Sequence, residues 1–139
     1  GPLDERDPIN DFYISLIHDC KSIDYLGEIS QSEHFYNQID VLVLPSHREG
    51  FPTVVLEASS MKKAIITSRS TGCIDSIIEN KTGIHCDLNE ESLIKSIEYY
   101  INNPTKISEH GEMGREFITT NFNNKLIWKE LLKEYKKIF

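Results

Sequence analysis

The chain of 139 residues has the length of one domain, 1–139, that can bury a single hydrophobic core. Its 15 lysines and arginines against 22 aspartates and glutamates give a net charge of −7, which argues against a nucleic-acid partner. The three cysteines are widely spaced and include no C-x-x-C pair, so neither a zinc site nor a disulfide framework is indicated. We therefore expect reduced thiols in a cytoplasmic protein.

Four short runs rich in β-branched and aliphatic residues follow one another along the chain. Each is bounded by Gly, Pro, Ser or Asp, which is typical of buried strands. The predicted strands span 22–28, 40–46, 63–68 and 82–87.

Apolar residues at helical spacing lie before, between and after these runs. The first predicted helix lies within 7–20, with Pro8 in its first turn, and a later one is capped by Asn89. The predicted helices span 7–20, 32–39, 52–61, 89–102, 104–122 and 123–139. We expect the last of them to cover one face of the sheet.

Strands that alternate with helices predict an α/β fold, a Rossmann-like parallel sheet with helices on both faces. In such sheets a ligand binds beyond the carboxyl ends of the strands, in the loops that lead into helices. A binding site is therefore expected in a loop that connects the end of a predicted strand to the start of a predicted helix.

The stretch SHREGFPTVVLE, 46–57, is such a connection. Pro52 suits the first position of the helix, whose free amides and dipole favour an anion such as phosphate. Gly50 lets the backbone approach a ligand without a side chain in the way.

Two acids, Glu49 and Glu57, flank this anion site. Carboxylates repel an anion, so they would accept hydrogen bonds from hydroxyl groups. A phosphate between two hydroxyl-bearing rings describes a nucleotide sugar. The alternative is that both acids are ordinary surface residues, which are common at helix starts and in polar loops.

EGFPTVVLE resembles the E-x7-E motif of the retaining glycosyltransferases of family 4, whose architecture is called GT-B. The flanking segments DVLVLPS and GCIDSIIENKTGIHCD agree with that resemblance, which spans about 20–120. REGFP and GC look most like bacterial enzymes that build capsular polysaccharide or O-antigen. The chain would then be most of the C-terminal, donor-binding half of a GT-B fold.

The resemblance implies a role for each matching residue. Glu57 would bind the ribose hydroxyls, and Glu49, assigned as the catalytic residue, would contact the donor sugar near the reacting carbon. The turn between them would meet the sugar and the diphosphate through Gly50, Phe51, Pro52, Thr53 and Val54. Gly27, near the expected base, and Gly72, in the next loop, are weaker candidates for substrate binding.

The resemblance also implies the partners. We expect a nucleotide-sugar donor, UDP by family habit, and a glycan or lipid-linked acceptor held by an N-terminal domain that is absent, along with the first elements of this domain. The fragment alone should be inactive, and no metal or cofactor is expected. The whole enzyme could attach peripherally to the cytoplasmic face of the inner membrane.

Two other classes of protein share part of this pattern. A glycosidase also uses two carboxylates, but they face each other across a sugar. A phosphate-receiver interaction module shares the parallel sheet but needs an acid at the carboxyl end of a central strand. The identities of the sugar, the base and the acceptor are not encoded in recognisable residues.

Overall fold

The computed structural model of the chain describes residues 8–138, without the side chains of residues 124 and 126. The chain divides into two compact units, one that ends at Phe35 and one that begins at Tyr36. The expectation of one domain over 1–139 stays a prediction.

The first unit contains helix α1 (Asp11–Asp19) and an extended segment after it. The Asn10 side chain accepts a hydrogen bond from the Phe12 amide at 2.9 Å and caps this helix. The helix therefore begins after Asn10, and the prediction that Pro8 lies in its first turn is wrong.

The prediction of a strand at 22–28 is also wrong, because this segment joins no β-ladder among the described residues. A strand is stabilised by the partner that satisfies its backbone, and apolar composition alone does not supply one. Two of its apolar side chains, Tyr25 and Leu26, are 48% and 54% exposed.

The second unit is built on three parallel strands, β1 (Val41–Leu44), β2 (Ala64–Ser68) and β3 (Gly83–Cys86). They pair in the order β1-β2-β3, and every residue of β2 is buried. Three of the four predicted strands and the parallel α/β class are thus confirmed. Because the strands are parallel, their carboxyl ends share one edge.

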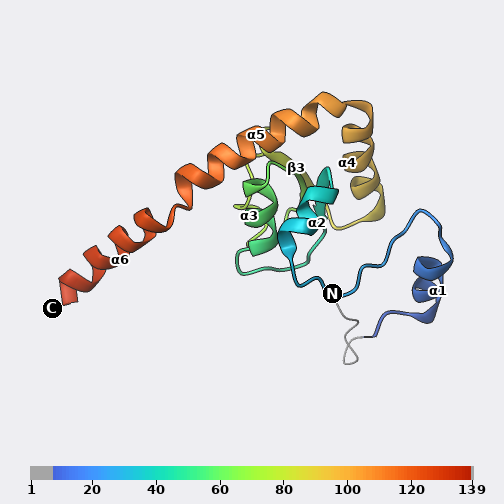
Figure 1. Cartoon of the computed structure of the whole chain (residues 1–139), viewed down its shortest axis with the longest axis horizontal. Coiled ribbons are helices and arrows are strands. Elements are labelled where there is room, and N and C mark those ends of the chain that lie inside the picture. The colour runs from blue at the N-terminus through green and yellow to red at the C-terminus, as the bar shows by residue number, and fades with distance from the viewer. Residues whose placement is uncertain (1–7, 139) are drawn as a thin grey trace. The chain divides into compact units, whose positions relative to one another are not determined.

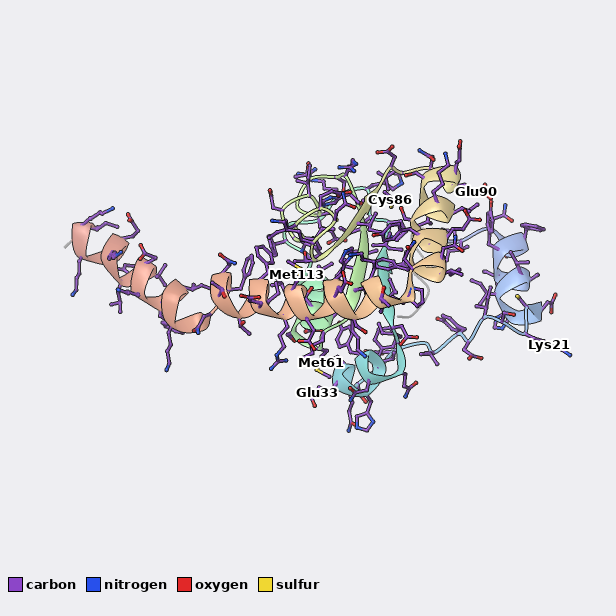
Figure 2. All side chains as sticks on the ribbon, turned by 90° about the horizontal axis from the view of Figure 1, so that it is seen from above. Lys21, Glu33, Met61, Cys86, Glu90 and Met113 are labelled. Atoms are coloured by element: carbon purple, nitrogen blue, oxygen red, sulfur yellow. The ribbon has the colours of Figure 1, made fainter. Side chains whose placement is uncertain are left out.

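Helices flank this sheet. α3 (Thr53–Ser60) lies on one side and α4 (Glu90–Asn102) on the other, while α5 (Pro104–Asn121) runs across both (Figures 1 and 2). The short helix α2 (Ser32–Gln38) precedes β1. Asn89 caps α4, as predicted, by accepting a hydrogen bond from the Ser92 amide at 2.8 Å.

The core on the α4 side joins alternate residues of the sheet to that helix. Ala64 and Ile66 of β2, Cys86 of β3 and Tyr100 of α4 form one buried cluster. In Figure 2, Cys86 marks the carboxyl end of β3 and Glu90 the start of α4. The alternation of side chains along each strand leaves Ile65 and Thr67 for the opposite face.

Two buried polar side chains connect α4 to α5. The Tyr100 hydroxyl lies 2.8 Å from Nδ1 of His110, and both residues are 2% exposed. Burial, followed by the charge of Lys106, lowers the pKa of His110, so the neutral imidazole is favoured in the folded protein.

The packing of α5 against the chain after α3 depends on a glycine. A Cβ at Gly111 would come within 2.1 Å of the carbonyl oxygen of Lys62, a distance that no real side chain tolerates. Gly114, one turn later, lies beside Ser59 with more room. The absence of a side chain at Gly111 therefore sets how closely α5 approaches.

The last helix is α6 (Asn124–Ile138). The prediction that it covers one face of the sheet is wrong. Its apolar residues stay exposed, among them Trp128 at 65% and Leu132 at 55%. Figure 1 shows α6 leading on from α5, away from the strands. Its apolar stripe is present in the sequence, but no sheet surface in the described chain meets it.

Candidate functional site

The loop between β1 and α3 ends in a helix start with open amides. Pro52 is the N-cap residue of α3 and makes no side-chain cap, while the Val55 amide turns back to the Pro52 carbonyl at 3.0 Å. The amides of Thr53 and Val54 donate to no acceptor among the described residues. Pro52 thus lies one position earlier than predicted, and the helix start has free amides as expected; that these amides bind an anion stays a prediction.

Hydroxyl groups from β2 and the residues after it hold the start of this loop. The Ser70 hydroxyl donates to the Ser46 carbonyl at 2.8 Å, and the Ser68 hydroxyl donates to the same oxygen. The Thr67 hydroxyl donates to the Leu44 carbonyl at 3.1 Å. Sequence reasoning missed these anchors, although the run of hydroxyl residues at the end of a buried strand was a usable signal.

The loop that contains Gly72 supports the backbone of the first glutamate. The Glu49 amide donates to the Thr71 carbonyl at 3.0 Å. Gly72 has a φ of +81°, and a Cβ there would lie 2.3 Å from the Glu49 carbonyl oxygen and 2.5 Å from that of Gly50. Only glycine fits this position, and packing alone accounts for it. The predicted ligand contact of Gly72 stays a prediction.

The middle of the turn is open on one side and packed on the other. A Cβ at Gly50 would meet no atom within 4 Å. Phe51 packs on Phe122 with ring centroids 5.1 Å apart, and Phe122 in turn meets Phe117 at 5.7 Å. The aromatic contact fixes the turn against the end of α5 and leaves the Gly50 backbone accessible.

The second glutamate is held by a tyrosine that sequence reasoning did not select. Glu57 is exposed on α3, and its Oε2 accepts a hydrogen bond at 2.8 Å from the hydroxyl of Tyr36, which is 4% exposed. Burial and this contact with the carboxylate raise the pKa of Tyr36, so the hydroxyl keeps its proton. The two residues are far apart in sequence, which is why no local pattern revealed the pair.

Gly27 belongs to the first unit and adopts a φ of +63°, a left-handed turn that suits glycine. A Cβ there would meet nothing within 4 Å. Its predicted contact with the base stays a prediction.

A charged cluster lies at the carboxyl ends of β2 and β3. Arg69 pairs with Glu79 at 3.3 Å and approaches Asp87 at 3.8 Å, while Nδ1 of the buried His85 also contacts the Glu79 carboxylate. Because two acids already neutralise Arg69, this cluster is not a ready anion site. The spacing of these residues along the chain did not predict the cluster.

Among residues 8–138, no group of three or more His, Cys, Asp or Glu side chains could hold a metal ion. The expectation that the protein works without metal or cofactor stays a prediction. None of the helices in this range is long and apolar enough to cross a membrane.

Residues 14–117 match the family described as glycosyl transferases, group 1. The chain therefore belongs to this family of glycosyltransferases. The fold agrees, since a sucrose-phosphate synthase from Thermosynechococcus elongatus, a GT-B glycosyltransferase, superposes with a TM-score of 0.84 at 23% identity. That likeness covers all of this chain and 37% of the synthase.

Two further proteins are similar over most of the chain. The capsular polysaccharide biosynthesis glycosyltransferase CapM of Staphylococcus aureus is 29% identical over 136 residues, which are 97% of this chain and 36% of the relative. The Anabaena protein Alr3699/HepE, solved in complex with UDP, superposes with a TM-score of 0.80 at 15% identity, over 91% of this chain and 37% of that one. The chain thus spans 36% to 37% of the length of these three proteins.

Proposed function

We propose that the chain is the donor-binding part of a retaining glycosyltransferase that uses a UDP-sugar. The observation that carries the proposal is the pair of open amides at Thr53 and Val54, with Glu49 before them and Glu57 one turn after. The amides suit a diphosphate, and the carboxylates suit hydroxyl groups. The UDP-bound state of the structurally similar HepE supports the choice of nucleotide.

The chemistry follows from how charge develops at this turn. As the bond between sugar and diphosphate breaks, negative charge grows on the diphosphate, and the open amides of Thr53 and Val54 stabilise it. The sugar becomes oxocarbenium-like, and the Glu49 carboxylate keeps the sugar in position by accepting hydrogen bonds from the sugar hydroxyls. The hydrogen bond from the Glu49 amide to the Thr71 carbonyl fixes the backbone from which this carboxylate projects.

We propose that transfer itself also needs the acceptor-binding part of a longer enzyme, since the chain covers 36% of the CapM relative. The acceptor, proposed to be a glycan or a lipid-linked glycan of a bacterial surface polysaccharide, would be held by another domain. We expect this chain alone to bind a donor and transfer nothing. Membership in the glycosyltransferase family favours this function over a glycosidase or a phosphate-receiver module.

A cytoplasmic location, with peripheral attachment to the inner membrane, belongs to the same proposal. The exposed face of α6 supports it, because Trp128 and Leu132 lie among the lysines 125, 129, 133 and 136. Such a face suits an anionic lipid surface.

The direct test is a titration of the ¹⁵N-labelled chain with UDP, followed by NMR. If the proposal is correct, the Thr53 and Val54 amide signals shift on addition of UDP. Uridine is the matched control ligand, since it lacks the diphosphate and should leave these two amides unchanged. Failure of UDP to bind, or equal shifts with uridine, would refute the diphosphate site.

A further inference from the structure

The hydrogen bond between Tyr36 and Glu57 joins a buried residue to an exposed one. The tyrosine ring is almost wholly buried, so its hydroxyl occupies a position fixed by packing. The glutamate is exposed on α3 and would otherwise sample several rotamers. The contact of 2.8 Å between the hydroxyl and Oε2 therefore restricts the carboxylate rather than the tyrosine.

The direction of this hydrogen bond also matters for the second carboxylate oxygen. A tyrosine hydroxyl that donates to Oε2 uses a lone pair of that oxygen and leaves Oε1 for another donor. Because Glu57 is exposed as a residue, Oε1 can meet a ligand from solvent. A carboxylate locked in one rotamer loses less entropy when a ligand hydroxyl binds to it.

We propose that Tyr36 is a positioning residue for donor binding, which presents the Glu57 carboxylate to the ribose hydroxyls of the nucleotide. This inference rests on the proposed function, because it assumes that Glu57 binds a hydroxyl-bearing ligand. It goes beyond that function by assigning a role to a residue of α2, outside the E-x7-E stretch.

The test is the Tyr36→Phe variant, which keeps the ring and removes only the hydroxyl. The variant should bind UDP about threefold to tenfold more weakly, as expected for the loss of one hydrogen bond that orients a binding group. Tyr100→Phe is the matched control, because Tyr100 is equally buried and its hydroxyl also makes a 2.8 Å contact, but with His110. That control should lose stability without changing the affinity for UDP.

A double-substitution cycle separates this inference from the function beneath it. If Tyr36 acts through Glu57, then Tyr36→Phe should cause no further loss of UDP affinity in a Glu57→Ala background. If Glu57→Ala itself leaves UDP binding unchanged, the proposed role of Glu57 fails. If Glu57→Ala weakens binding but Tyr36→Phe does not, only the positioning role is overturned.

A measurement on the unsubstituted chain guards against a variant that does not fold. The Tyr36 hydroxyl proton should exchange slowly and show a nuclear Overhauser effect to the Glu57 methylene protons, and this signal should persist when UDP is bound. Loss of the signal on addition of UDP would mean that the ligand replaces the tyrosine. That result would overturn the positioning role.

Discussion

Gly72 lies so close to Glu49 that a Cβ on the glycine would stand 2.3 Å from the glutamate carbonyl oxygen. Gly72→Ala must therefore displace the loop that carries Glu49, and it also places alanine in a left-handed conformation that costs ~1–2 kcal/mol. We expect lower stability in urea unfolding and weaker binding of UDP-glucose.

Gly50→Ala is the matched control for that substitution. Gly50 has open space around it, so its replacement by alanine should change the free energy of unfolding by no more than ~0.5 kcal/mol. Binding of UDP-glucose should still weaken, because the added methyl group stands where the ligand would approach the backbone. A Gly72→Ala protein as stable as the unsubstituted chain would contradict the packing argument.

Gly111 and Gly114 of α5 allow a second comparison. Alanine in place of glycine normally stabilises a helix by ~1 kcal/mol. At Gly111 the new methyl group would overlap the Lys62 carbonyl at 2.1 Å, so Gly111→Ala should lower the melting temperature. At Gly114 the nearest atom, Cβ of Ser59, is 3.6 Å away, so Gly114→Ala should raise it. Equal effects of the two substitutions would be incompatible with the close approach of α5.

The burial of His110 should make the stability of the chain depend on pH. Its pKa is lowered by burial, so the unfolded chain binds the proton more readily below about pH 6.5. The contribution of His110 is complete above this pH and declines as the pH falls from there toward the lowered pKa, by at most ~1.4 kcal/mol per pH unit. The stability difference between the unsubstituted chain and His110→Asn should therefore shrink on acidification.

The measurement is urea unfolding of both proteins between pH 8 and pH 5. His34→Asn is the control for replacing a histidine with asparagine, since His34 is exposed on α2. A difference between the chain and His110→Asn that stays constant over this range would show that burial does not perturb the histidine.

Nucleotide binding should not need a divalent metal. The proposed diphosphate site consists of backbone amides, which carry the positive end of a helix dipole and need no cation to attract an anion. Calorimetric titration with UDP should give the same affinity with EDTA as without it. A requirement for Mg²⁺ or Mn²⁺ would contradict this assignment.

The local features that sequence reasoning predicted correctly are those with local causes. The apolar run 41–44 and the helix start after Pro52 were both visible in the neighbouring residues of the stretch 40–57. Asn89 was predicted as a cap because capping acts within three residues. The class of fold followed from the alternation of such local elements.

The errors and omissions share a different cause, which is pairing across the chain. The segment 22–28 has the composition of a strand but no ladder in the described structure, and α6 has an apolar stripe but no surface to cover. The contacts of Tyr36 with Glu57 and of Gly72 with Glu49 join residues more than twenty positions apart. No spacing rule within a single element reveals such contacts.

The two glutamates give the most direct test of the central claim. If Glu57 binds the ribose, Glu57→Ala should weaken the binding of UDP and UDP-glucose alike, by roughly tenfold to a hundredfold for the loss of a charge-assisted hydrogen bond. If Glu49 binds the sugar, Glu49→Ala should weaken UDP-glucose and leave UDP nearly unchanged. Calorimetric titration of both variants with both ligands measures these four affinities, with the fold checked by circular dichroism. Small and equal effects of the two substitutions on both ligands, in folded proteins, would contradict a donor-binding site at this turn.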